Sequence, residues 1–414
     1  MKKPSFWKLL FPNHTKNITS FLQKLSEYES QLLVGKGDYD EISEWLSKEL
    51  NDKEQVREYR KRVLPKLIPF LFLLIDSTKK RQESDPAFDE GELDMDLAIK
   101  IARFKCPMGV EAIAELMKIG HKEKSFHWVT ILQYLCNDRE SIEIIINKLK
   151  GRLPREDCGN CYLDTLNEIC RNDDSFGPHP FSSPEGVVRL EYHLTSDDRD
   201  YAFSAASSLP FMPENVWKKL LPIAMVHPNK KVQIEACWAG TKLGNKDSLE
   251  KLIESAKDYR YGSMCVRYLK ELGLADLIPE ECQTHEFYAL SEMSSWLEHP
   301  LEFGAIPTEL SIVESRKLCW PSTKDEQQFT IVRYRYEKWN KDGSDEVGVG
   351  LVGSVTFCLF GLEGLNERTP EEIFAIHCAW EMELDDYANP EVGMAILRKH
   401  NPGFGDLSEK SENS

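Results

Sequence analysis

Five apolar segments with helical spacing recur along the middle of the chain, and this recurrence restricts the fold more than any other feature. The segments begin at Gly109, Ser141, Gly186, Asn215 and Ser248. Most starts therefore lie roughly 30 to 33 residues apart, with one gap of about 45. A partner segment with apolar or small residues at i, i+3, i+4 and i+7 follows each of them. Two helices per repeat at this period are typical of an α-solenoid, in which stacked neighbours bury the face that one repeat cannot bury alone.

The stretch from Asn229 to Gly273 carries the repeat most clearly. Its first half reads KVQIEACWAGTKLG, where Ala236 and Gly240 allow close helix approach. This stretch resembles bacterial HEAT-like repeats of the phycobilisome-lyase type, although Gln233 stands where an arginine is usual in that family. The resemblance implies a mainly α fold over residues 95–283, a right-handed α-solenoid of HEAT-like helix pairs.

Residues 1–94 are less regular, and we expect them to form an N-terminal helical cap followed by an acidic linker. The apolar run LIPFLFLLI, Leu67 to Ile75, has about half the length that a membrane span needs, so it predicts a buried helix. The acidic stretch from Arg81 to Asp96 predicts an exposed linker. Residues 405–414 are predicted to be a disordered tail.

Residues 284–404 have the composition of a small α+β module. Three stretches rich in β-branched and aromatic residues predict an antiparallel β-meander: Glu309–Trp320, Gln328–Trp339 and a third that begins at Glu346. Next, TPEE places Thr369 at an N-cap and Glu372 in a capping box, which predicts a helix that packs on the sheet. The tract from Trp296 to Trp380 is similar to a module of uncharacterised bacterial proteins that carry HEAT repeats, and this similarity implies no activity.

The third stretch contains GVGLVG, which matches the dinucleotide-binding pattern G-x-G-x-x-G. That pattern binds pyrophosphate when a strand precedes the glycines and a helix follows them. Here a polar turn precedes Gly348, and the following SVTFCLF favours a strand. We therefore interpret Gly348, Gly350 and Gly353 as sites of a bulge, a bend or close packing, and we expect no cofactor.

A C-x-x-C pair offers a weak candidate for a metal site. Cys158 and Cys161 are followed by Cys170 and His179, and four such ligands suit tetrahedral zinc if they converge. The alternative, which we favour, places Cys161 and Cys170 on the apolar face of a repeat helix and Cys158 in the preceding loop. On this interpretation the protein binds no metal.

Candidate partner-binding residues come from the predicted strands and from one repeat. Alternation along the second strand puts Arg333 and Arg335 on one side, where guanidinium groups could grip an acidic partner. The alternative is neutralisation by Glu314, Glu337 or Glu346 across the sheet. Trp320 is either a core anchor or an exposed interaction residue, and Lys218 and Lys219 complete the set.

The net charge disfavours some classes of function. With a formal charge of −17, the chain repels a phosphate backbone, which disfavours nucleic acid and with it a HEAT-like DNA-repair glycosylase. We see no signal peptide or membrane span, so we expect a cytoplasmic protein. The leading hypothesis is a non-enzymatic scaffold that binds a protein partner of unknown identity, and the sequence does not reveal its oligomeric state. The alternative is an enzyme with a site between the solenoid and the C-terminal module.

Overall fold

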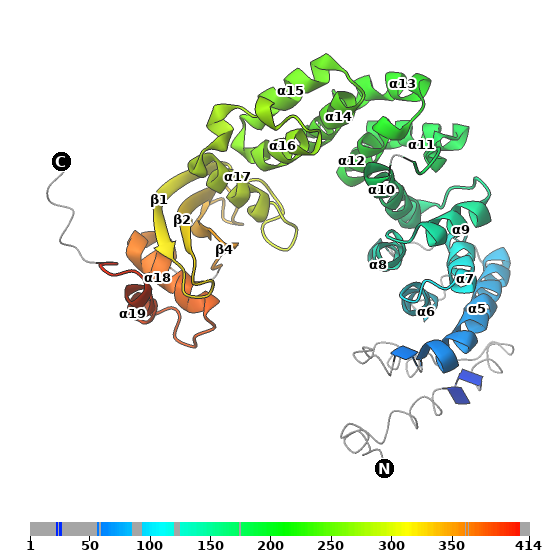
Figure 1. The fold of residues 1–414 in the computed structure, drawn as a ribbon, viewed down its shortest axis with the longest axis horizontal. Coiled ribbons are helices and arrows are strands. Elements are labelled where there is room, and N and C mark those ends of the chain that lie inside the picture. Colours follow the sequence, from blue (N-terminus) through cyan, green and yellow to red (C-terminus); the bar gives the residue numbers. More distant parts are fainter. Residues whose placement is uncertain are drawn as a thin grey trace, which may run out of the picture. The chain divides into compact units, whose positions relative to one another are not determined.

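The computed structural model describes residues 22–23, 25–26, 56–57, 59–84, 93–119, 125–173, 175–360, 362 and 364–405. Within these residues the protein is mainly helical, with 15 α-helices and a four-stranded antiparallel sheet near the C-terminus (Figure 1). None of the described helices is long and apolar enough to cross a membrane. The chain divides into two compact units, Met1–Ala236 and Cys237–Ser414.

The first unit is helical throughout its described residues. Its elements are η1 (Tyr59–Val63), α5 (Leu64–Ser84), α6 (Leu93–Ala102), α7 (Pro107–Met117), α8 (Ser125–Leu135), α9 (Arg139–Leu149), α10 (Glu156–Asn172), η2 (Pro180–Ser182), α11 (Pro184–Thr195), α12 (Arg199–Ser208), η3 (Leu209–Phe211), α13 (Glu214–Ala224) and the first half of α14 (Lys230–Lys242). Each predicted repeat segment of this unit is a helix. Helices two apart in sequence contact each other: α6 with α8, α8 with α10, α10 with α12, α7 with α9, and α11 with α13.

Local sequence signals explain where these helices begin. Asp138, Ser183 and Asp198 each stand at an N-cap and accept a backbone N–H of the first turn with their side-chain oxygen. Such a side chain satisfies one of the donors that the first turn leaves free. The starts of α9, α11 and α12 therefore follow from a short polar residue placed just before the apolar segment, whereas the N-cap residues of α7, α10 and α13 make no side-chain cap bond.

Within residues 1–94 the structure confirms the predicted buried helix and corrects the predicted linker, while the role of this region as a cap stays a prediction. The run from Leu67 to Ile75 lies within α5, and most of its side chains are buried, as predicted. The prediction of an exposed linker over residues 81–96 is wrong at both ends, because residues 81–84 belong to α5 and α6 begins at Leu93. Asp94 and Met95 are buried, since apolar residues recur at helical spacing among the acids. Residues 85–92, most of residues 1–58 and the predicted tail beyond Gly405 lie outside the described residues.

The second unit combines helices with the sheet. Its elements after α14 are α15 (Lys246–Ala256), α16 (Tyr259–Glu271), η4 (Ala275–Leu277), η5 (Glu280–Gln283), α17 (His285–Leu297), β1 (Glu309–Cys319), β2 (Glu326–Tyr336), β3 (Glu346–Val352), β4 (Thr356–Cys358), η6 (Leu365–Glu367), α18 (Pro370–Glu381) and α19 (Pro390–His400). The strands pair in the order β1-β2-β3-β4, each antiparallel to the next. The predicted meander is thus confirmed, and β4 is a fourth strand formed by the end of the third stretch.

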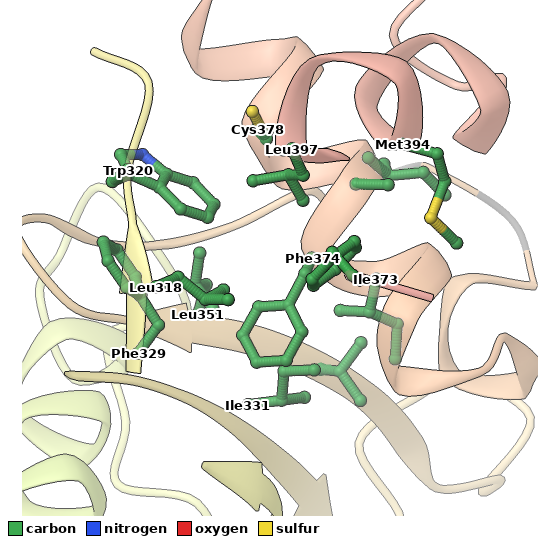
Figure 2. Packing of buried hydrophobic residues seen from close by; sticks show 14 of the residues in the cluster. Leu318, Trp320, Phe329, Ile331, Leu351, Ile373, Phe374, Cys378, Met394 and Leu397 are labelled. Carbon is green, nitrogen blue, oxygen red and sulfur yellow. The ribbon is translucent and has the colours of Figure 1, made fainter. Parts of the chain in front are cut away.

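Helices cover both faces of the sheet. This arrangement is possible because the apolar side chains of β2 point alternately to one face and to the other. Ile331 lies in a core cluster with Phe374 of α18 and Leu397 of α19 (Figure 2). Val332 and Tyr334 point to the opposite face, where they pack with residues of α17. Because strand side chains alternate in direction, one apolar strand supplies both cores. The Thr369–Glu372 capping box that begins α18 is confirmed.

The glycines of the G-x-G-x-x-G pattern make room for side chains of neighbouring segments. A Cβ built on Gly348 would lie 2.2 Å from Tyr334 Oη, and one on Gly353 would lie 2.1 Å from the Phe329 ring. On Gly350 it would lie 2.3 Å from Cys358 Sγ. A strand, β4, follows these glycines instead of the helix that a dinucleotide site requires. The predicted close packing at the three glycines is therefore confirmed.

Replacing Gly350 with alanine is expected to lower the free energy of unfolding by about 1–3 kcal/mol, the usual cost of overpacking a core. Cys358→Ala removes the sulfur that the new methyl group would meet, so the double variant should be more stable than the sum of the two single effects predicts. Chemical denaturation of the four proteins of this cycle measures the coupling. Strict additivity would show that the two side chains do not compete for the same space.

Candidate functional site

The two arginines proposed as partner contacts both lie on β2 but differ in their surroundings. Arg335 donates to Asp345 Oδ2 at 2.7 Å and to Glu309 Oε2 at 3.2 Å. Two carboxylates therefore neutralise it, although neither is one of the three considered from the sequence. Arg333 is exposed and donates to the main-chain oxygen of Asn366 at 3.4 Å. A role for either arginine in gripping an acidic partner stays a prediction.

The two candidate lysines lie on α13 of the first unit. Lys218 pairs with Glu214 at 2.5 Å, and Lys219 pairs with Glu191 at 2.6 Å. The lysine side chains are 60% and 54% exposed, and ion pairs as exposed as these contribute only about 0–1 kcal/mol. Both lysines can therefore exchange partners at little cost, and their role in partner binding also stays a prediction.

Trp320 must be removed from the set of partner-binding residues. It is completely buried between the sheet and α18, and its ring stacks on Phe329 with centroids 4.2 Å apart (Figure 2). Its indole N–H donates to Glu381 Oε2 at 2.6 Å. Of the two alternatives for this residue, the structure shows the core anchor, because α18 covers the strand end that carries it.

The cysteines of the weak metal candidate are buried within one helix. Cys158, Cys161 and Cys170 all belong to α10. The interpretation of Cys158 as a loop residue is therefore wrong, because α10 begins two residues earlier at Glu156. His179 precedes η2, and its Nδ1 accepts the backbone N–H of Phe181.

Burial determines the protonation of these groups, and it disfavours the thiolate of both cysteines. Burial raises the pKa of the Cys161 thiol to about 12 and that of Cys158 well above its usual value, whereas zinc binds the thiolate. Burial also lowers the pKa of His179 to about 3, which keeps the imidazole neutral, the form that can ligate a metal. Over the described ranges of the chain, no group of three or more His, Cys, Asp or Glu side chains is placed to hold a metal ion.

The second unit contains a pocket of about 430 Å³ that the sequence did not reveal. Its walls include the rings of Phe303, Tyr334, Trp339 and Phe360 and the carboxylates of Glu302 and Glu346, and we call it the aromatic pocket. Aliphatic side chains, among them Val349, Leu359 and Leu365, complete the lining.

The rings of the aromatic pocket form one cluster around Phe303. The Phe303 centroid lies 5.6 Å from Tyr334, 5.6 Å from Trp339 and 5.0 Å from Phe360, and each pair has an edge-to-face arrangement. Trp339 and Phe360 are each 45% exposed. Large aromatic side chains that contact one another and remain this open to solvent are a feature of binding surfaces.

The charges at the aromatic pocket have one sign. Of the described residues that line it, none is lysine, arginine or histidine. Burial raises the pKa of Glu302 above its usual value, while the nearby His299 acts in the opposite direction. Glu346 Oε2 accepts a hydrogen bond from Asn340 at 3.4 Å. This lining suits an apolar or cationic ligand better than an anion.

The aromatic pocket also borders an unpaired part of the sheet. β4 pairs only with the last three residues of β3, Gly350 to Val352. In the described part of the chain, no strand covers the outer edge of β3 from Glu346 to Val349, and these four residues line the pocket. Val349 is buried, whereas Glu346, Val347 and Gly348 are partly or fully exposed, so these three residues can offer backbone donors and acceptors to a further strand.

The residues of the aromatic pocket are far apart in the sequence and come together only in the folded protein. Phe303, Trp339 and Phe360 lie in three connecting segments, after α17, β2 and β4 respectively. The one sequence signal near the site is Gly348, which we considered for nucleotide binding and which lines the aromatic pocket.

Neither the family models nor the curated proteins and solved structures compared with this chain match it.

Proposed function

We propose that this protein is a non-enzymatic scaffold for protein-protein interaction. In this proposal the helix pairs of residues 95–283 stack as a right-handed HEAT-like α-solenoid, and the C-terminal α+β module binds a segment of a partner at the aromatic pocket. The contacts between helices two apart in the first unit support the stacking, because solenoid repeats contact their neighbours along the stack.

The observation that carries the proposal is the position of the aromatic pocket beside the free edge of β3. An extended segment that adds to a sheet edge gains affinity from main-chain hydrogen bonds and specificity from pockets for its side chains. Both features lie together at Glu346–Gly348, the part of this edge that is open to solvent.

Site-specific photo-crosslinking of the full chain in its native cells tests this function. A photoreactive side chain at Val347, which is 37% exposed beside the aromatic pocket, is expected to form a discrete covalent adduct with a protein. The matched control is Val355 in the turn before β4, which is 46% exposed and outside the pocket lining. Equal adduct yields at both positions, or no protein adduct at Val347, would contradict the proposal.

A further inference from the structure

The walls of the aromatic pocket combine two features that attract the same kind of ligand. The rings of Phe303, Tyr334, Trp339 and Phe360 carry negative electrostatic potential on their faces, which attracts organic cations. Glu302 and Glu346 add formal negative charge at the same pocket. A cation that enters leaves water but meets ring faces and carboxylates in exchange.

We propose that the aromatic pocket binds an organic ammonium cation on an apolar stem, presented as the methylated lysine side chain of an extended partner segment. The protein source of the cation rests on the function proposed above, whereas the preference for an ammonium cation depends only on the pocket. The segment pairs with the edge of β3 at Glu346–Gly348, which no described strand covers, and its methylated lysine enters the pocket beside the ring cluster.

The charges around the aromatic pocket select against other ligands. An anion would meet Glu302 and Glu346 without a basic side chain among the described lining residues. Arg333 lies close by, since it donates to the Asn366 main chain, but it does not line the pocket. A neutral apolar group gains the contacts with the rings and with Leu359, yet it forgoes the attraction of both carboxylates.

Methylation suits the aliphatic part of the lining. Val349, Leu359 and Leu365 offer apolar contact to methyl groups, and the acceptors for the hydrogen-bond donors of a primary ammonium are confined to other lining residues, among them Glu302 and Glu346. A quaternary ammonium has no such donors to satisfy, so it keeps its charge and loses less on leaving water. Aromatic sites that recognise quaternary ammonium groups use this property.

Calorimetric titration of the full chain with two capped peptides tests the preference. One peptide carries trimethyllysine at its centre, and the other carries the neutral analogue in which carbon replaces the quaternary nitrogen. We expect the charged peptide to bind at least ten-fold more tightly, a difference of about 1.4 kcal/mol. Choline is the small-molecule arm, and it should bind more weakly than the charged peptide because it cannot pair with β3.

Two variants link the preference to the aromatic pocket. Glu302→Gln removes one carboxylate and should reduce the preference for the charged peptide to about three-fold or less, or about 0.7 kcal/mol. Glu337→Gln is the matched control, because Glu337 is an exposed carboxylate of the same unit that does not line the pocket. Trp339→Leu keeps apolar area but removes an aromatic face, and it should weaken the charged peptide more than the neutral one. Thermal unfolding of each variant verifies that the fold is intact.

The outcomes separate this inference from the proposed function. Equal binding of the charged and neutral peptides, or no binding of either, overturns the ammonium preference even if Val347 still crosslinks to a protein. Tighter binding of choline than of the charged peptide overturns the peptide source. If the charged peptide is preferred while Val347 captures no protein, the pocket chemistry stands and the scaffold function fails. An unchanged preference in Glu302→Gln would show that the cation binds elsewhere.

Discussion

Replacing Trp320 with alanine is expected to lower the free energy of unfolding of the second unit by about 3–5 kcal/mol. The indole is completely buried, stacks on Phe329 and donates to Glu381. Its removal leaves a large cavity between the sheet and α18, and it deprives a carboxylate of a hydrogen-bond donor. Chemical denaturation followed by circular dichroism measures the loss.

Two controls separate the contributions to this effect. Trp320→Phe keeps an apolar ring but not the N–H, so it should cost less than the alanine variant. Trp339→Ala removes the same side chain from a position that is 45% exposed, so we expect about half the loss of Trp320→Ala, roughly 2–3 kcal/mol, in proportion to its smaller buried area. Similar losses in Trp320→Ala and Trp339→Ala would contradict the assignment of Trp320 to the core.

Replacing Gly393 with alanine is expected to destabilise the second unit, although this substitution inside a helix ordinarily stabilises by about 0.5–1 kcal/mol. Gly393 lies on α19, and a Cβ there would be 1.8 Å from the main-chain oxygen of Ala375 on α18. A main-chain atom cannot rotate away, so the two helices must separate. We expect a loss of about 3 kcal/mol or more, at the upper end of the usual overpacking range.

The test is whether Gly393→Ala raises or lowers the free energy of unfolding. Thermal and chemical unfolding of Gly393→Ala should both show a less stable protein, with weaker packing of Met394 and Leu397, which belong to the same core cluster. As a control, Ala395→Gly changes an exposed position of the same helix and should cost only the propensity difference of about 1 kcal/mol. A more stable Gly393→Ala protein would mean that α18 and α19 do not approach each other this closely.

The sequence alone determined those features that depend on a few neighbouring residues. The repeat segments are helices and the Thr369–Glu372 capping box begins α18, because spacing and capping act within about one turn. The two-sided alternation along β2 is confirmed for the same reason, since the direction of a strand side chain depends only on its position. At Asp94 and Met95 the acidic composition concealed such a pattern, and the predicted linker is partly a helix.

Tertiary structure alone decided which residues are covered and which meet. Trp320 and Trp339 are both tryptophans that follow neighbouring strands, β1 and β2. Trp320 is buried against α18, whereas Trp339 is 45% exposed to solvent. The aromatic pocket joins three connecting segments that share no local pattern. Burial and ring contacts depend on atoms far away in the sequence, whereas periodicity and capping report only on near neighbours, so no pattern along the chain could place these side chains together.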